Sequence, residues 1–433
     1  MNILLIGSGG RENTFAWKIA QSPLCKKLYI APGNAGTSAF GENIAINVTD
    51  FAGMQDFCVS HRIDLLVVGP EEPLVKGLRD RFQEDDRTRH IGIVGPGSDG
   101  AELEGSKDFS KKFMKKYGVP TAGYETFTKE TASEGISYIH KQPLPIVLKA
   151  DGLAAGKGVL ICPSHEEAER EFKAMLLDEK FGAASRKVVI EEFLTGIELS
   201  VFVALDGSDF VILPEAKDYK RIGDGDSGPN TGGMGAVSPV PFADEAFMAK
   251  VSQRIVEPTL SGLKQEGIDY KGFIFIGLMN QDGEPFVIEY NVRMGDPETQ
   301  AVLPRIKSDF VALLHGIANQ ELKNYSLELE DFITTTVVMV AGGYPGSYEK
   351  DKEITGLEPD GKNNALVFHA GTAVIESGAV VTQGGRVLGI TGKGATLEEA
   401  LDSAYTRVRQ ISWEGVNFRK DIGQDILHWN GND

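Results

Sequence analysis

Short apolar runs that stop at glycine or proline turns dominate the first hundred residues of the chain. Each run is long enough for one strand, and the residues between runs are sufficient for a helix. Runs without polar alternation are typical of parallel strands that are buried on both faces. The runs cover residues 3–6, 27–30, 64–68 and 91–94, and the turns are Gly7, Pro32-Gly33, Gly69-Pro70 and Gly95-Pro96-Gly97. The pattern predicts an α/β fold that begins with an open doubly wound domain, whose ligands bind beyond the carboxyl ends of the strands.

The net charge and the cysteines indicate which partners and which cellular compartment to expect. The formal net charge is −18, which disfavours a nucleic-acid partner because such binding relies on cationic side chains. The three cysteines include no CxxC pair, which indicates a reducing compartment. No apolar run approaches the roughly 18 residues of a membrane span, and the N-terminus lacks a signal-peptide pattern. We therefore expect a cytoplasmic protein without a membrane partner.

Two further segments follow, as the 433 residues allow for about three domains. The first is expected to begin near Glu104, with a helix that Ser106 caps and Gly118 ends. Six glycines between residues 223 and 235 predict a mobile loop. The second of the two further segments is expected to begin near Asp331. Strands are predicted at residues 146–149, 188–190, 199–205, 273–279, 285–290, 334–340 and 387–391, with an Asp282-Gly283 hairpin turn and helices capped by Ser164 and Thr396.

The turn after the first apolar run is rich in glycine but lacks a dinucleotide fingerprint. Glu12 stands where the third glycine of GxGxxG belongs, which disfavours NAD. Gly9 and Gly10 still offer N–H groups to a phosphate at the start of a helix. Arg11 beside this turn, and Asn34 in the turn after the second strand, favour a small phosphorylated ligand. A tight turn without a ligand is the alternative.

Residues 151–158 (DGLAAGKG) resemble a P-loop without being one. Only three residues separate the first two glycines, and Gly158 takes the place of the P-loop Ser or Thr. The many exposed N–H groups, with Lys149 before them and Lys157 among them, predict a loop that closes over the β- and γ-phosphates of a nucleotide. A flexible hairpin turn is the alternative.

Acidic residues follow the next buried strand, in Glu191-Glu192-Phe193-Leu194 and at Glu198. A strand that passes into a linker presents backbone groups to an adenine ring, and a carboxylate a few residues later accepts ribose hydroxyls. Acidic residues at strand ends are also commonly just solvated, so this signal is weak on its own.

Polar side chains also cluster where the apolar run around residues 285–290 ends. Glu289 and Asn291 face the same side of a strand, and Arg293 follows at the next such position. Two oxygen ligands without His or Cys suit Mg²⁺ that bridges nucleotide phosphates. A surface cluster of salt bridges is the alternative. The chain has no Gly-x-Ser-x-Gly elbow, so nucleophilic hydrolysis lacks support.

Taken together and in order, these motifs resemble those of the phosphoribosylamine–glycine ligases (glycinamide ribonucleotide synthetases), which are ATP-grasp enzymes of purine biosynthesis. The resemblance runs nearly end to end. It is carried by residues 9–12, 32–37, 69–71, 103–107, 149–158, 228–235, 295–298 and 368–372. The chain departs from the family at Asn13 and Tyr219, where His is usual, and at Met294, where Leu or Phe is usual.

The resemblance implies three domains and a reaction. Residues 1–104 would bind substrate, residues 105–330 would form the ATP-grasp domain with an ATP-covering subdomain at about 121–192, and residues 331–433 would form a small α+β domain. ATP would phosphorylate the carboxylate of glycine, and the amine of 5-phosphoribosylamine would displace the phosphate. The product would be glycinamide ribonucleotide, with residues 223–235 as a lid against water. Mg²⁺ or Mn²⁺ would assist, in a monomer or homodimer.

The resemblance also assigns residues to roles. Those assigned to ATP are Lys107, Lys149, Gly152, Gly156, Lys157, Gly158, Glu191, Glu192, Phe193, Leu194 and Glu198. Those assigned to the other substrates are Gly9, Gly10, Arg11, Glu12, Asn34, Gly36, Thr37, Glu71, Asp218 and Arg293. The metal ligands would be Glu289 and Asn291, and the catalytic residues Arg293, Asp296 and Lys149. Two other readings stay open: another ATP-grasp ligase, such as a biotin carboxylase or a formate-dependent transformylase, and a non-catalytic nucleotide-binding regulator.

Overall fold

A five-stranded parallel sheet forms the N-terminal region of the computed structural model, which describes residues 1–152, 158–358 and 365–429. Its strand order is β3-β2-β1-β4-β5. The strands are β1 (Asn2–Gly7), β2 (Lys27–Pro32), β3 (Glu42–Asn43), β4 (Leu65–Val68) and β5 (Gly92–Val94). The four predicted strands are confirmed, and the two-residue β3 is an addition to them.

Helices cover both faces of this sheet, which is why its central strands β1 and β4 are almost entirely apolar and buried. Leu4 and Ile6 of β1 pack into one core, while Ile3 and Leu5 pack into another. The helices of this region are α1 (Gly10–Ile19), α2 (Phe51–His61), α3 (Glu71–Val75), α4 (Leu78–Glu84) and α5 (Ser98–Gly105). A helix from much later in the chain, α12 (Phe310–Asn319), packs against β4 and β5. The turn after β1 also lies close to this later part of the chain, because Arg11 contacts Met294 and Asp296.

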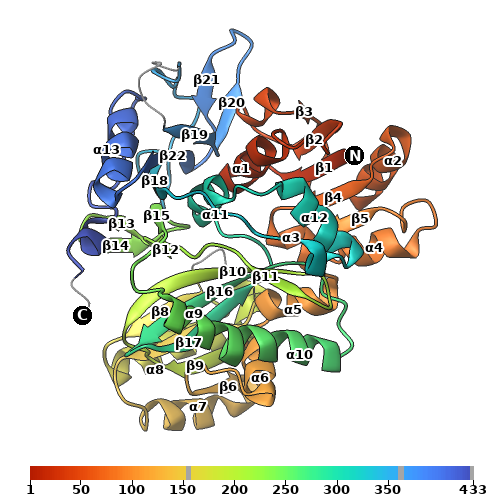
Figure 1. Ribbon diagram of the computed structural model, residues 1–433. Coiled ribbons are helices and arrows are strands. Elements are labelled where there is room, and N and C mark those ends of the chain that lie inside the picture. The colour runs from red at the N-terminus through yellow and green to blue at the C-terminus, as the bar shows by residue number, and fades with distance from the viewer. Residues whose placement is uncertain (153–157, 359–364, 430–433) are drawn as a thin grey trace.

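The central region begins with α6 (Lys107–Tyr117), which starts and stops as predicted. The side chain of Ser106 accepts the N–H of Phe109 at 3.1 Å, and Gly118 ends the helix in the left-handed conformation. A four-stranded antiparallel sheet follows, in the order β6-β9-β7-β8. Its elements are β6 (Tyr124–Thr128), α7 (Ala132–Ile139), β7 (Ile146–Ala150), β8 (Val159–Cys162), α8 (His165–Leu176) and β9 (Lys187–Glu192). This small unit lies at the bottom of Figure 1, with α7 and α8 on its outer face.

A second antiparallel sheet carries the polar cluster predicted after residue 288. Its order is β11-β10-β16-β17. Its elements are β10 (Ile197–Leu205), β11 (Phe210–Ile212), α9 (Glu245–Val251), α10 (Glu257–Gln265), β16 (Gly272–Gln281) and β17 (Glu284–Asn291). The predicted turn between β16 and β17 is confirmed, because Asp282 and Gly283 both have positive φ angles. A bulge near the end of β17 leaves Ile288 without a partner on β16.

The C-terminal sheet takes strands from both sides of residue 331. Its order is β12-β15-β18-β22-β19. These strands are β12 (Lys217–Asp218), β15 (Gly235–Ser238), β18 (Ile333–Val340), β19 (Leu366–His369) and β22 (Arg386–Gly394). One face is covered by α13 (Leu397–Val408), and α11 (Glu298–Val302) also packs against β15, β18 and β22. The remaining elements are the hairpins β13 (Arg221–Gly223) with β14 (Ser227–Asn230) and β20 (Thr372–Val374) with β21 (Val380–Thr382), and α14 (Gln424–Leu427).

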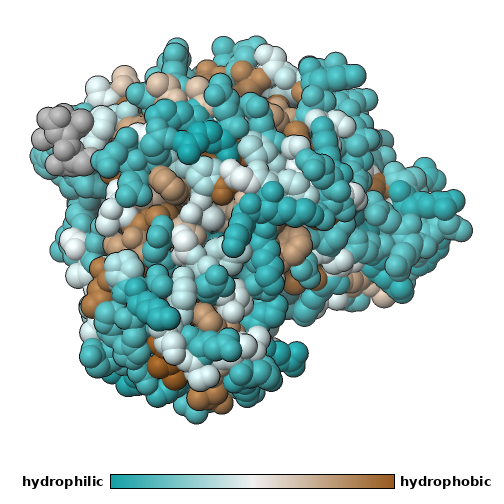
Figure 2. All heavy atoms as spheres, turned by 90° about the horizontal axis from the view of Figure 1, so that it is seen from below, coloured by the Kyte–Doolittle hydropathy of each residue, from teal (hydrophilic) through white to brown (hydrophobic). Residues whose placement is uncertain are grey.

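The N-terminal and C-terminal regions lie side by side, with α1 next to β19 (Figure 1). The face seen from below is mainly hydrophilic, and its hydrophobic residues occur in small groups (Figure 2). In the described parts of the chain, no helix is both long enough and apolar enough to cross a bilayer.

Candidate active site

Three side chains at the end of β17 lie together, as the alternation of the strand predicts. Nδ2 of Asn291 is 3.5 Å from Oε1 of Glu289, and Nη2 of Arg293 donates to Oδ1 of Asn291 at 3.3 Å. Burial raises the pKa of Glu289, but nearby lysines outweigh burial and hold it below its ordinary value. Those lysines are Lys107, Lys149 and Lys220. Glu289 is therefore an ionised carboxylate among cations.

A buried ion-pair group links the small sheet to this cluster. Lys149 and Lys111 lie 3.0 and 2.9 Å from Oε2 of Glu191, and all three side chains are almost fully buried. Lys149 also donates to the carbonyl of Ile288 at 3.1 Å, the residue that the bulge frees from the β16 ladder. Lys111 instead donates to Thr121 at 2.8 Å, and burial lowers its pKa to about 8. The carboxylate of Glu191 thus forms ion pairs with two lysines of the protein itself.

The remaining residues predicted to bind nucleotide lie around these lysines. Nζ of Lys107 is 3.4 Å from the carbonyl of Glu104. Gly152 and Gly158 bracket the predicted phosphate loop, while Gly156 and Lys157 lie outside the described residues. Glu192 ends β9, and the predicted linker that follows, with Phe193 and Leu194, connects the two central sheets. Glu198, on β10, is ion-paired with Lys220.

Arg293 is held in place by two carboxylates from the N-terminal half. Nη2 lies 2.9 Å from Glu104, and Nε lies 3.3 Å from Glu71. Burial raises the pKa of Glu71, but Arg293 and Arg11 outweigh it and leave that pKa below its ordinary value. Glu104 also accepts the N–H of Val292, yet burial keeps its pKa raised. The guanidinium orientation is therefore fixed from two sides.

The turn after β1 is organised by Glu12. Its carboxylate accepts the N–H of Gly9 at 2.6 Å and Nε of Arg11 at 2.5 Å. Nη1 of Arg11 donates to the carbonyl of Met294 at 3.1 Å. This contact joins the N-terminal sheet to the turn that follows Arg293.

Asp296 in that turn is also engaged on several sides. It accepts Nε2 of Gln300 at 2.8 Å and the N–H of Arg11 at 3.3 Å, and Nη2 of Arg386 lies 3.5 Å away. Burial raises the pKa of Asp296, but Arg386 and Arg11 outweigh it and hold that pKa below its ordinary value. Asp296 therefore acts as a junction between the N-terminal, central and C-terminal regions.

Comparison with known proteins identifies the family of this chain. Residues 1–104, 105–299 and 334–425 match the N domain, the ATP-grasp (A) domain and the C domain of phosphoribosylglycinamide synthetase. The chain belongs to the phosphoribosylglycinamide synthetase family.

Relatives and solved structures agree with this assignment over the full length. A phosphoribosylamine–glycine ligase of Clostridium acetobutylicum is 45% identical over 98% of this chain and 100% of its own. One from Mesorhizobium japonicum is 46% identical over 98% of both chains. The crystal structure of a phosphoribosylamine–glycine ligase from Thermotoga maritima superposes with a TM-score of 0.84 at 38% identity, covering 98% of this chain and 100% of that one. The biotin carboxylase domain of a 2-oxoglutarate carboxylase from Hydrogenobacter thermophilus shares the fold, with a TM-score of 0.71 at 18% identity over 96% and 91% of the chains.

Within this synthetase fold, the side chain of Asn34 makes hydrogen bonds to other parts of the protein. Its Oδ1 accepts the N–H groups of Gly36 and Thr37 at 2.9 and 3.0 Å. Its Nδ2 donates to the carbonyls of Ser8 and His369 at 2.9 and 2.8 Å. The amide therefore fastens the turn after β2 to the C-terminal region, and substrate binding by Asn34 and Gly9 stays a prediction.

We expect Asn34→Ala to destabilise the protein by about 2–4 kcal/mol, because each of the four shortest hydrogen bonds of its side chain contributes roughly 0.5–1.5 kcal/mol. Urea unfolding would measure the loss. Asn34→Asp is the comparison variant, since it keeps the acceptor for the turn but replaces the donor to Ser8 and His369 with a charged oxygen. A loss below about 0.5 kcal/mol for Asn34→Ala, the range of ordinary surface changes, would contradict this role.

The three departures from the family pattern all lie inside the protein. Oδ1 of Asn13 accepts the N–H of His369 at 2.8 Å, next to the bridge made by Asn34. The hydroxyl of Tyr219 donates to Asp425 at 2.5 Å, so it faces the C-terminal segment. Met294 is buried and presents its carbonyl to Arg11.

The segment predicted to be a mobile glycine-rich loop, residues 223–235, contains regular structure. The segment contains the β13–β14 turn and leads into β15. The N–H of Gly225 donates to Asp421 at 2.7 Å, and Arg419 lies 2.5 Å from Asp226. Partners almost 200 residues away thus contact the glycine-rich segment, and its role as a lid stays a prediction.

Three further residues lie in the site although no sequence motif assigns them a role: Lys111, Glu104 and Glu298. Lys111 follows Lys107 by one helical turn of α6, and this spacing is the signal that points to it. Glu104 lies two residues before the Ser106 cap and has no comparable signal.

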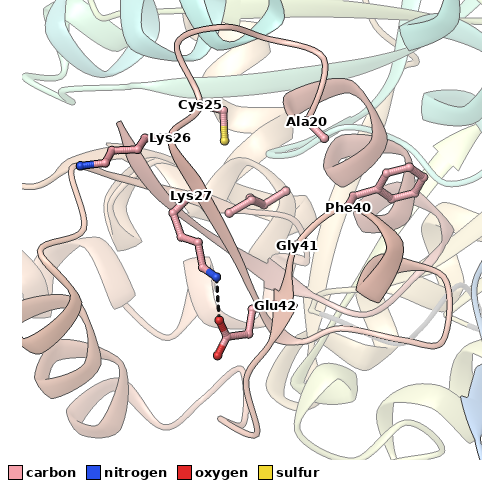
Figure 3. Close-up of a pocket in the computed structure, with 8 residues that line it drawn as sticks. Ala20, Cys25, Lys26, Lys27, Phe40, Gly41 and Glu42 are labelled. Atoms are coloured by element: carbon pink, nitrogen blue, oxygen red, sulfur yellow. Dashed lines mark ion pairs between the residues drawn. The ribbon is translucent and has the colours of Figure 1, made fainter.

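A surface hollow of about 450 Å³ lies away from this site. It is lined by residues of β2 and β3 and the segments before them, including Cys25, Lys26 and Phe40 (Figure 3). Lys27 is ion-paired with Glu42 there. None of the predicted site residues lines this hollow.

Proposed function

We propose that this chain joins glycine to 5-phosphoribosylamine at the expense of ATP, giving glycinamide ribonucleotide, ADP and phosphate in purine biosynthesis. Full-length similarity to phosphoribosylamine–glycine ligases supports this activity. Within the molecule, the proposal rests on the end of β17, where Glu289, Asn291 and Arg293 lie among lysines. A reaction that brings a carboxylate up to a triphosphate requires such neutralising charge.

ATP would be bound between the two central sheets. Lys107, Lys149 and the loop at residues 152–158 would hold its phosphates. Backbone groups of the linker after β9 would form hydrogen bonds with the adenine ring. Glu198 would release Lys220 and accept hydrogen bonds from the ribose hydroxyls. The direct contact of Lys149 with Ile288 supports its place on the phosphate side, because Ile288 precedes Glu289.

The donor set at Glu289 and Asn291 fits Mg²⁺ or Mn²⁺, which favour oxygen ligands. Gly277 is paired with Glu289 across the sheet and leaves the space beside its side chain open. Among the described residues, no group of three or more His, Cys, Asp or Glu could hold a metal. The other ligands would therefore be phosphate oxygens and water. When bound, the ion would neutralise and orient the phosphates.

The reaction would proceed in two displacements. A carboxylate oxygen of glycine attacks the γ-phosphorus, and the bond to the bridging oxygen of ADP breaks. The amine of 5-phosphoribosylamine then attacks the acyl carbon of glycyl phosphate, phosphate leaves, and the nitrogen loses a proton. Arg293, whose direction Glu71 and Glu104 fix, would steady the acyl phosphate during both steps.

We further propose that residues 1–104 bind 5-phosphoribosylamine, residues 105–330 bind ATP, and residues 331–433 complete the enzyme. The phosphate of the ribose would lie near residues 9–12 and 34–37, at the carboxyl ends of β1 and β2. The protein would act in the cytoplasm as a monomer or homodimer, on small molecules alone.

An ADP-release assay tests this function. Glycine and freshly prepared 5-phosphoribosylamine would each be omitted in turn, and glycinamide ribonucleotide would be identified by mass spectrometry. We expect product only when both substrates and ATP are present. ADP release that depends instead on bicarbonate or formate would assign the chain to another ATP-grasp activity.

A further inference from the structure

A second hollow, of about 540 Å³, is lined by α6, the edge strand β6 and the first residue of β9. These elements lie together at the bottom of Figure 1. The volume is within the range of pockets that hold small ligands. The charged side chains that line it are those of Lys112, Lys115, Lys116, Lys187, Asp108 and Glu125.

This hollow and the proposed ATP site use different faces of α6. Lys107 and Lys111 are four residues apart and lie on the face that meets Glu289 and Glu191. Asp108, like the lysines of α6 that line the hollow, is displaced from them by one residue, and each residue of a helix turns about 100°. The described residues that line the hollow therefore include none of those assigned to ATP or to the other substrates.

A single buried carboxylate organises two of the four lysines. Oδ2 of Asp108 lies 2.8 Å from Nζ of Lys112 and 2.8 Å from Nζ of Lys187. Burial raises the pKa of Asp108, but these two lysines outweigh burial and hold that pKa below its ordinary value. The side chain of Asp108 is only 4% exposed, whereas that of Lys112 is 67% exposed and that of Lys187 is 42% exposed. Both ammonium groups are thus positioned from beneath and remain accessible to a ligand.

The other two lysines give the hollow an excess of positive charge. Lys115 has no ion-pair partner in the part of the chain that the structure describes, and Lys116 pairs with a carboxylate that does not line the hollow. Four lysines therefore face two carboxylates, in a chain whose net charge is −18. Such a local cluster attracts anions against the charge of the whole molecule. The partly buried Tyr124 adds an aromatic ring to the lining.

The hollow also lies next to the start of the proposed phosphate loop. Oδ1 of Asp151 accepts the hydroxyl of Ser106 at 2.8 Å and the N–H of Asp108 at 3.1 Å. The N–H of Asp151 donates to the carbonyl of Lys187 at 3.1 Å. Because the two sites are this close, a test of the hollow requires that the ATP site is occupied first.

We propose that this hollow is a second anion site, which binds the phosphate group of a small phosphorylated ligand. Phosphate oxygens would accept charge-assisted hydrogen bonds from Lys112, Lys115 and Lys187. The organic part of a phosphate ester would pack against Tyr124. The inference goes beyond the proposed function, because it concerns a ligand that is not a substrate of the ligase reaction.

Calorimetry tests the site in the full-length protein. AMP or inorganic phosphate would be titrated in after the ATP site has been saturated with a non-hydrolysable ATP analogue and Mg²⁺. We expect one AMP to bind per chain. The double variant Lys112→Gln/Lys115→Gln should raise the Kd for AMP about 10- to 100-fold, because two charged donors are lost. Its Kd for the ATP analogue should equal that of the wild type, which verifies that the variant is folded.

Lys173→Gln is the matched control, because it removes a cation of the same small unit that pairs with Glu169 and does not line the hollow. It should bind AMP like the wild type. Tighter binding of AMP than of inorganic phosphate would identify a phosphate ester as the ligand, and equal binding would identify free phosphate. The inference is overturned if neither probe binds saturably beside the ATP analogue, or if the double variant binds them as well as the wild type does.

Discussion

Glu289→Gln is expected to reduce the turnover of the ligase by about 100- to 1,000-fold while the protein stays folded. A metal ion on the phosphates is worth several kcal/mol of transition-state stabilisation, and each 1.36 kcal/mol is a tenfold change in rate. The nearby lysines hold Glu289 in its charged form, which is the form that binds a cation. Glutamine keeps the shape and removes the charge, so the loss should appear as a weaker response to Mg²⁺.

The measurement is glycine-dependent ADP release over a titration of Mg²⁺, together with thermal unfolding. Glu284→Gln is the matched control, because Glu284 begins the same strand and its ion-pair partners among the described residues are Lys250 and Arg254, at the surface. It should behave like the wild type. Near-normal turnover of Glu289→Gln at limiting Mg²⁺ would mean that the metal lies elsewhere.

Lys149→Met is expected to lower kcat/KM for ATP by at least about 100-fold, comparable with the loss of one preorganised donor in other active sites. Lys149 and Lys111 share the same oxygen of Glu191, but their other partners differ. Lys149 reaches Ile288 beside Glu289, whereas Lys111 reaches Thr121. Of these two lysines, only Lys149 therefore lies at the proposed binding site for the ATP phosphates.

Lys111→Met separates catalysis from stability. Each variant removes one of two cations from buried Glu191, so each should destabilise the protein by a similar amount, about 1–3 kcal/mol in urea unfolding. Only Lys149→Met should lose activity beyond what unfolding explains. If both variants lose kcat/KM for ATP equally, Lys149 has a structural role and does not contact the nucleotide.

Local patterns account for most of the fold that can be predicted here. The Ser106 cap, the Asp282-Gly283 turn and the apolar strands each depend on residues that are close in sequence, and all three are confirmed. Glu289, Asn291 and Arg293 also follow from the two-residue repeat of a single strand.

Long-range pairing explains what the sequence does not reveal. The polar atoms of Asn34 and Arg11 are typical of a phosphate site, but their partners His369 and Met294 lie 335 and 283 residues away. A donor that is used by a distant carbonyl has the same sequence signature as a donor that is free for a ligand. The glycine-rich segment before β15 was equally ambiguous, because Asp421 holds it from the far end of the chain.

The mixed origin of the C-terminal sheet limits how the gene can be cut and recombined. β15 and β18 are neighbours in that sheet, and Thr334 donates to the carbonyl of Ser238 across the boundary at 3.1 Å. A fragment that ends before β18 would leave β15 with an open edge, which is prone to pair with other chains and aggregate. Productive chimaeras between relatives should therefore inherit β12, β15 and the last hundred residues from a single parent.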